Sequence, residues 1–256
     1  MSALCDPDPY NDTVFRHELT ALYGGGDLQV GNGDLARTKD GALRLGSIPF
    51  NAMFRLVQFW RLNAPAMRLM FDTIRELRDT ASKLEKKREE ILSKGPAQGR
   101  FLDSNDVESY HTVNDAIGAG ELSRSAMAGS LMIVLSSLLG RFKDDLDASP
   151  ADWNAGSPKY ANYSIGEIVG AAANSFRHED EWTKALFAKK ITKRQRLSME
   201  VLRSALGWPI DSDTYYPKCE AVLDLISGGD FDQLAKAILI FANGVALQAE
   251  TRSVSP

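Results

Sequence analysis

The sequence is poor in the residues that define several common classes of protein. Its 256 residues include two cysteines and three histidines, and 30 lysines and arginines are set against 34 aspartates and glutamates. Cys5 and Cys219 lie far apart and in no metal-ligand spacing, which argues against a disulfide framework or a zinc site and is typical of a reducing compartment. The net charge of −4 argues against a strongly basic nucleic-acid-binding protein but allows a local basic patch.

Motifs for metal, phosphate-loop and serine-hydrolase chemistry are also missing. There is no His-x-x-x-His and no cysteine pair, and the acidic residues around His178 splay around a helix, so we expect no metal and no cofactor. Gly24-Gly25-Gly26 lacks the Lys-Ser/Thr that a phosphate-binding loop requires, and Gly31-Asn32-Gly33 is typical of a turn. No pattern resembles a nucleophile elbow.

Long apolar runs are absent too. The longest, Met127–Leu139, contains Gly129 and three serines and is too short to span a bilayer. Residues 1–10 have neither the basic nor the apolar part of a signal peptide. Hydrophobic residues make up 44% of the chain, which is enough for a sizeable core. These features predict a cytoplasmic protein without membrane association.

The first 48 residues predict a small segment with mixed structure. A short helix is expected over Asp12–Tyr23, starting at Asn11 or Asp12 and stopped by the three glycines that follow. Residues 35–45 alternate around Asp40-Gly41, which predicts a β-hairpin.

From Pro49 to about Lys94 the apolar residues recur at steps of three and four, which predicts a long bundle helix. Pro65 should kink this helix or divide it in two. Its distal part, Lys83–Glu90, is nearly all charged, so only a thin apolar stripe is left there. About 45 helical residues would reach roughly 65 Å.

A second long helix is predicted from Asp103 or Ser104 to about Phe142, antiparallel to the first because the connection is short. Three of its glycines, Gly118, Gly120 and Gly129, permit close approach of a neighbouring helix. The remaining helices are expected after a loop over residues 143–160, at 162–190, 192–206, 217–226 and 231–249. The fold class is therefore all-α: a helical bundle over residues 49–250, built on a long antiparallel helix hairpin, with a small N-terminal β-hairpin and a disordered tail at 251–256.

Four polar residues share one face of the helix expected over residues 162–190. Asn174, Arg177, His178 and Glu181 stand three and four positions apart, with Trp182 beside His178. An amide, a guanidinium, an imidazole and a carboxylate on one face can bind an anion and move a proton. The structural alternative is a hydrogen-bond cluster that fixes helix packing, with Trp182 in the core and Arg177–Glu181 an ordinary pair.

The string that holds these residues, Ala173-Asn-Ser-Phe-Arg-His-Glu-Asp-Glu-Trp182, resembles an AN-x-x-(K/R)H-x-x-EW signature of uncharacterised bacterial proteins in the HEPN-like helical superfamily. The resemblance implies a helical bundle, a homodimer, and metal-independent endoribonuclease activity in toxin–antitoxin, stress or phage-defence systems. It implies that Arg177 stabilises phosphate charge and that His178 acts as acid or base on a ribose hydroxyl or leaving oxygen, supported by Asn174 and Glu181. The usual superfamily motif separates the arginine from the histidine by several positions, whereas Arg177 and His178 are adjacent.

Other charged residues are candidates for substrate binding, each with a structural alternative. Arg124 lies on the apolar seam of the second long helix and should pair with Glu121, Glu181 or Glu167, either as a second wall of the site or as an ordinary surface pair. The basic run after the motif includes Lys184, Lys189, Lys190 and Arg194, which either contact phosphates or form a solvated helix end.

Two functions are therefore open. The first is an RNA-binding or ribonuclease protein, with RNA and an antitoxin or another protein as partners. The second is a non-catalytic helical interaction or dimerisation module in which the Arg-His-Glu cluster is structural. His17 and His111 are expected to be histidines without a catalytic role.

Overall fold

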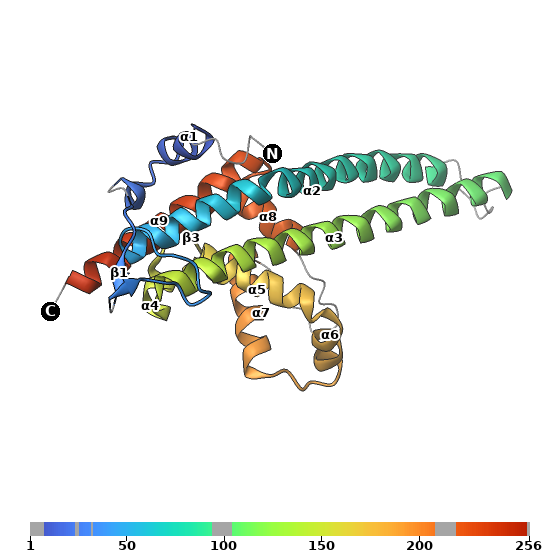
Figure 1. Cartoon of the computed structure of the whole chain (residues 1–256). Coiled ribbons are helices and arrows are strands. Elements are labelled where there is room, and N and C mark those ends of the chain that lie inside the picture. The colour runs from blue at the N-terminus through green and yellow to red at the C-terminus, as the bar shows by residue number, and fades with distance from the viewer. Residues whose placement is uncertain (1–7, 24–25, 32, 94–103, 208–218, 255–256) are drawn as a thin grey trace.

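The computed structural model describes residues 8–23, 26–31, 33–93, 104–207 and 219–254. Within them the chain is helical apart from two small antiparallel strand pairs, β1–β2 and β3–β4 (Figure 1). The helices are α1 (Asp8–Arg16), the short 3-10 helix η2 (Thr20–Leu22), α2 (Ile48–Ser93), α3 (Ser104–Leu146), α4 (Pro150–Ala155), α5 (Ile165–Arg177), α6 (Glu179–Phe187), α7 (Lys193–Leu206), α8 (Cys219–Ser227) and α9 (Phe231–Val254). The strands are β1 (Val30–Gly31), β2 (Asp34–Leu35), β3 (Lys159–Tyr160) and β4 (Tyr163–Ser164).

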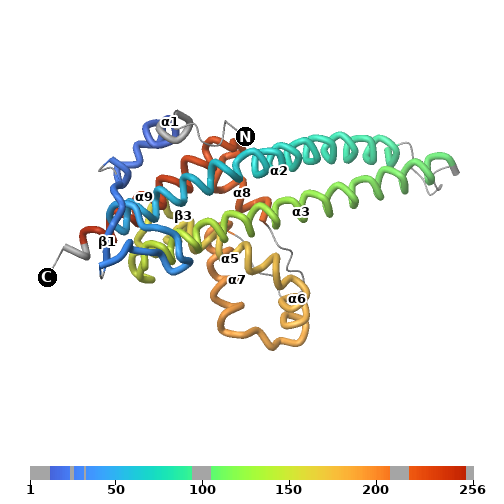
Figure 2. Tube along the Cα trace, viewed as in Figure 1, coloured from blue at the N-terminus to red at the C-terminus, as the bar shows by residue number. Residues whose placement is uncertain are grey.

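The long hairpin of α2 and α3 is the frame of the molecule and confirms the predicted all-α bundle. The two helices run antiparallel, and their distal halves extend beyond the other helices (Figure 2). There the packing narrows to a small cluster of Ile91, Val113 and Ile117, with Leu84 and Tyr110 against it. This is the thin apolar stripe that the charged segment 83–90 predicts.

The main core lies at the proximal end of the hairpin, where α5, α8 and α9 pack against it. One continuous cluster joins apolar side chains of α2 and α3 to those of α5, α8 and α9. Its largest fully buried members include Met53, Leu131, Phe142, Ile165 and Phe241. One wide face of α9 is buried in this core, and its opposite face is exposed at positions such as Asp232, Lys236 and Gln248.

Pro65 does not divide α2, which is a single helix through that position. A proline removes one backbone hydrogen bond but can be kept where surrounding packing holds the helix together. Met67, Phe71 and Ile74, just beyond the proline, are buried in the core. The tertiary contacts of α2 therefore compensate for the free energy that is lost with this hydrogen bond. In Figure 1 the axis of α2 changes direction along its length.

At the N-terminus the structure corrects one boundary and refines the hairpin. Helix α1 begins at Asp8 and ends at Arg16, so the expected helix over 12–23 is wrong at both ends. In the β1–β2 pair Val30 lies opposite Leu35 and Gly31 opposite Asp34, and Arg37 forms an isolated β-bridge with Leu43 across the Asp40-Gly41 turn. The predicted small N-terminal β-hairpin is confirmed.

The segment expected to be a loop, residues 143–160, is largely structured. Helix α3 continues to Leu146, and Ser149 then starts α4 with a capping box closed by Asp152. The Ser-x-x-Asp spacing is the sequence signal for that helix start. The β3–β4 pair follows and leads directly into α5.

At the C-terminal end the expected boundaries hold for α7 and for the start of α9, whereas the predicted disordered tail at 251–256 is wrong over residues 251–254, which are helical. Gly207 adopts a left-handed conformation that ends α7, and Gly228 and Gly229 separate α8 from α9. Helix α9 continues to Val254, beyond the predicted end of the bundle at residue 250. The expected start of α8 at Pro217 and the connection at residues 95–99 lie outside the described residues.

Among the described residues, one helical stretch, Asn105–Leu146, is long and apolar enough to cross a bilayer, with a mean hydropathy of 1.5 in its most apolar window. The central helix of a packed bundle meets the same criterion. Leu131, Met132 and Leu135 of this stretch are completely buried against neighbouring helices. Of the most apolar window of this stretch 39% is buried in the bundle, so packing accounts for part of its composition.

Gly129 sets the distance between α3 and α5. A β-carbon at this position would lie 2.2 Å from the ring of Phe176, so the glycine lets α5 approach α3. At Gly118 and Gly120 a β-carbon would meet nothing within 4 Å. Close helix approach is therefore confirmed at one of the three glycines and absent at the other two.

Alanine substitutions should distinguish Gly129, where two helices are in close contact, from Gly118 and Gly120, where they are not. Gly129→Ala should lower the free energy of unfolding by roughly 1–3 kcal/mol because Phe176 must move. Gly118→Ala and Gly120→Ala should raise it by up to about 1 kcal/mol, because alanine favours the helix. Chemical denaturation followed by circular dichroism measures all three, and equal effects at the three positions would contradict the packing described.

Candidate functional site

The motif region is built from two helices, not from the single helix that the periodicity predicts. Helix α5 starts at Ser164, whose hydroxyl and backbone form a capping box with Glu167. It ends at Arg177, and α6 begins at Glu179, so His178 flanks both helices. His178 has φ −120° and ψ 26°, outside the helical range, and its side chain does not cap α6.

The acidic run after His178 explains the break. Glu179, Asp180 and Glu181 form the first turn of α6, where carboxylates interact favourably with the positive end of the helix dipole. Partial burial and the neighbouring Asp180 raise the pKa of Glu179. The three consecutive acidic residues therefore indicate a helix start. The apolar periodicity alone does not indicate it, because it fits one continuous helix.

The break rearranges the four predicted residues. Asn174, His178 and Glu181 line one groove of about 320 Å³, and Arg177 is not part of its lining. The Nδ1 atom of His178 lies 3.3 Å from the Oε2 atom of Glu181. Arg177 is exposed at the end of α5, and its predicted role beside His178 stays a prediction.

The opposite wall of the groove comes from the start of α7. Thr192, Arg194, Gln195 and Ser198 line it, and Thr192 forms a capping box with Gln195. Sequence reasoning identified Arg194 but missed the other three, although the Thr-x-x-Gln spacing is a helix-start signal. Arg194 is thus the cation that the structure brings to His178.

Trp182 holds the two walls together. It is 3% exposed and forms a small apolar cluster with Leu186 of α6 and Met199 of α7. His178, by contrast, has a side chain 48% exposed to solvent, and that of Glu181 is 70% exposed. The tryptophan is structural, as the alternative interpretation predicts, while the imidazole and carboxylate face solvent.

The other basic candidates lie along the outside of this unit. Lys184 is exposed near the end of α6, and Lys189 and Lys190 are exposed in the link to α7. Phe187 lies among them with 68% of its surface exposed. Residues 177–207 contain eight lysines and arginines and four acidic residues, a local net charge of +4 in a chain of net charge −4.

Arg124 belongs to a different cluster. Its guanidinium lies 3.4 Å from the Oε1 atom of Glu220 on α8, and Glu220 also pairs with Arg78 of α2. Arg78 pairs in addition with Asp224. Arg124 therefore pairs with Glu220 and not with the expected Glu121, Glu181 or Glu167. It connects α8 to the hairpin and is not among the residues that line the groove with His178.

Of the remaining sequence candidates, His111 is exposed on α3 beside Tyr110. Within the part of the chain that the structure describes, no group of three histidine, cysteine or acidic side chains is placed to hold a metal ion. Cys219 is buried against Ala172, and burial raises the pKa of its thiol to about 12. Cys5 lies outside the described residues.

Comparison of the chain with protein-family models, with curated proteins and with solved structures finds no match.

Substitution of Glu220 or Glu121 tests which of these two carboxylates pairs with Arg124. Glu220→Gln should lower the free energy of unfolding by roughly 1–3 kcal/mol, because the largely buried guanidinium of Arg124 loses its carboxylate. Glu121→Gln is the matched control on the exposed face of α3 and should leave stability unchanged. Urea denaturation of both variants decides between the two partners, and a larger loss for Glu121→Gln would contradict the assignment.

Proposed function

We propose that the protein binds single-stranded RNA and cleaves it without a metal ion at the groove between α5, α6 and α7. The observation that carries the proposal is the solvent-exposed His178–Glu181 pair, 3.3 Å apart, facing a groove that also presents Arg194. A histidine oriented by a carboxylate and placed beside a guanidinium combines a proton acceptor with an anion-binding group.

The pairing assigns the roles of the two imidazole nitrogens. Nδ1 faces the Glu181 carboxylate, which favours the tautomer with the proton on Nδ1, and Nε2 would then keep a free lone pair. Nε2 would accept the proton of a ribose 2′-hydroxyl as the 2′-oxygen attacks the adjacent phosphorus. The bond from phosphorus to the 5′-oxygen breaks, and that oxygen takes a proton from water. The products are a 2′,3′-cyclic phosphate and a 5′-hydroxyl.

Arg194 would stabilise the charge of the phosphorane, since a guanidinium binds two phosphate oxygens at once. In this proposal Arg194 has the role that the sequence resemblance implies for Arg177. Asn174 and Ser198 supply neutral hydrogen-bonding groups to the same groove.

The surface around the groove fits a single strand. Lys184, Lys189 and Lys190 provide exposed positive charge, and Phe187 exposes its ring among them. Single-stranded nucleic acids bind by phosphate contacts combined with base stacking on aromatic side chains. A base-paired strand has no free base face for Phe187.

The sequence resemblance to HEPN-like bacterial proteins supports the same proposal and suggests a role in stress, toxin–antitoxin or phage-defence systems, as a homodimer. A second candidate is a non-catalytic interaction module. It is favoured by the burial of Trp182, which shows that part of the motif fixes packing, and by the projecting distal ends of α2 and α3.

An RNA-cleavage assay in EDTA tests the proposed chemistry. The wild type should cleave unstructured RNA to 2′,3′-cyclic phosphate products, and His178→Ala should slow cleavage by roughly 100-fold or more through loss of the base. His111→Ala, at an exposed histidine of α3, is the matched control and should cleave at the wild-type rate. Absence of cleavage by the wild type, or equal loss in the two histidine variants, would refute the nuclease assignment.

Binding to the strand is tested separately from cleavage. In the His178→Ala background, Phe187→Ala should weaken binding of a fluorescent single-stranded RNA by about 1–3 kcal/mol through lost stacking. Leu197→Ala removes another exposed apolar side chain, on α7, and should have no effect. Fluorescence anisotropy measures both affinities, and an equal loss for the two variants would mean that no base stacks on Phe187.

A further inference from the structure

One face of α3 is uncharged and open to solvent. Six positions at steps of three and four residues share this face, because such positions lie on one side of a helix. Five of them are exposed and one is half-buried. Leu122 is 73% exposed, the highest value of any large apolar side chain among the described residues. We call this surface the outer face of α3, and it consists of Ala119, Leu122, Ala126, Ser130, Ile133 and Ser137.

The apolar composition of α3 exceeds what its packing within the chain requires. On the opposite side of the helix, Leu131 and Leu135 are buried in the core, yet the most apolar window of α3 is only 39% buried. A helix face in contact with water normally carries charged side chains. Residues 122–140 contain a single charged residue, Arg124, and it pairs with Glu220 of α8. The outer face therefore has the composition of a surface that another apolar surface covers.

The serines of the outer face do not oppose its burial. The hydroxyl of Ser130 donates a hydrogen bond to the carbonyl oxygen of Ala126 at 2.8 Å, and the hydroxyl of Ser137 donates one to the carbonyl oxygen of Ile133 at 2.8 Å. A buried hydroxyl is costly when it lacks a hydrogen-bond partner, and these two have partners within the helix. Ala126 and Ser130 are also small, so a second helix can approach the backbone of α3 closely.

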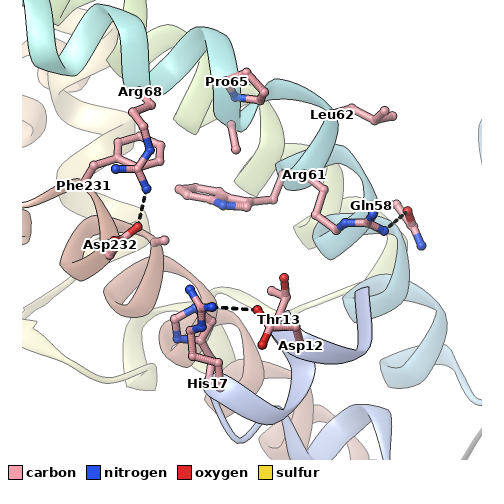
Figure 3. A pocket seen from close by; sticks show the side chains of 14 residues that line it. Asp12, Thr13, His17, Gln58, Arg61, Leu62, Pro65, Arg68, Phe231 and Asp232 are labelled. Carbon is pink, nitrogen blue, oxygen red and sulfur yellow. Dashed lines mark hydrogen bonds and ion pairs between the residues drawn. The ribbon is translucent and has the colours of Figure 1, made fainter. Parts of the chain in front are cut away.

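Two other open surfaces of the hairpin are rich in charge. A groove of about 610 Å³ lies between α1, α2 and α9, but the pairs of Arg16 with Asp12 and of Arg68 with Asp232 occupy its rim (Figure 3). Segment 83–90 of the distal hairpin is nearly all charged. Burial of such charges is costly, so a partner that buries apolar surface against the hairpin is better accommodated at the outer face of α3.

Charges of opposite sign lie at the two ends of the outer face. Asp115 stands four residues before its first position and Arg141 four residues after its last, and both are exposed. Ser137 and Arg141 line one groove, which shows that they share a surface. Asp115 forms no ion pair among the described residues. The guanidinium of Arg141 lies 3.8 Å from Asp40 and 4.6 Å from the centre of the Phe59 ring, and its side chain is 47% exposed.

The positions of these residues are symmetric about position 128. Asp115 and Arg141 are each 13 residues from this point, and Ala126 and Ser130 are each two residues from it. If two copies of α3 pair antiparallel through their outer faces, Asp115 of each copy therefore meets Arg141 of the partner subunit. A parallel pairing would bring like charges together at both ends, which costs free energy.

We infer that the outer face of α3 binds a second copy of this chain, with the two α3 helices antiparallel. Burial of Leu122 and Ile133 stabilises the dimer, and the two Asp115–Arg141 pairs at its ends set the direction of the helices. The outer face shares no residue with the α5–α7 groove, so this interface does not rest on the proposed RNA cleavage.

A negative charge at the centre of the outer face tests the interface. In sedimentation velocity experiments on the full chain, the mass of the wild type should rise with concentration from 28.1 kDa to twice this value. Ala126→Glu should weaken the dimer roughly 100-fold, because it buries two like charges within about one helical turn of each other. Ala151→Glu, at an exposed alanine of α4, is the matched control and should dimerise like the wild type.

Reversal of the end charges tests the antiparallel direction. Asp115→Arg and Arg141→Asp should each weaken the dimer roughly tenfold or more, because each variant alone places like charges at both ends of the interface. An equimolar mixture of the two variants should form heterodimers with about the wild-type affinity, because opposite charges then meet at both ends. Sedimentation velocity of each variant and of the mixture measures these affinities.

Ala126→Glu and Ala151→Glu should both keep the wild-type melting temperature, since both alanines are exposed. A wild type that stays monomeric at every concentration, an Ala126→Glu variant that dimerises like the wild type, or a mixture that associates as weakly as its components would each overturn the inference. Binding of a monomeric wild type to phosphatidylcholine vesicles, lost in Ala126→Glu, would also overturn it and would assign the outer face to a lipid surface.

Discussion

The apolar seam between α2 and α3 is the contact on which the rest of the structure depends. Helices α5, α8 and α9 pack against the proximal part of this seam, and the core is continuous only there. Both grooves are arranged by it: one uses α2 and α9 as walls, and the other is carried by α5, which Gly129 brings close to α3. The distal hairpin, by contrast, is held together by a few apolar residues, and its surface carries many solvated charges.

The long elements could be predicted from the sequence because their signals are local and repeated. A three-and-four spacing over forty residues leaves few alternatives, and glycines mark the ends of α7 and α8. The break at His178 was missed because one residue outside the helical range barely disturbs the periodicity. The acidic residues that follow His178 indicate where α6 starts. They do so only when they are interpreted as the first turn of a helix and not as part of a polar face.

The candidate site could be predicted only in part, for a related reason. Asn174, His178 and Glu181 are close in sequence, and the structure keeps them together. The partner of Arg124 lies 96 residues away on α8, so no local pattern could choose Glu220 over Glu121. The contact between Trp60 of α2 and Phe231 of α9 has the same character, since its two rings come from helices far apart in the chain.

The uneven distribution of charge described for residues 177–207 has a consequence for how the molecule meets a partner. With +4 in that segment and −4 overall, the remaining chain carries a net −8, so positive charge is concentrated in the α6–α7 part of an otherwise acidic protein. A polyanion approaching in solution exerts a torque that turns the α6–α7 face toward it before contact. At physiological ionic strength this electrostatic interaction is screened beyond about 8 Å. The salt concentration therefore sets the fraction of collisions in which the α6–α7 face meets the polyanion.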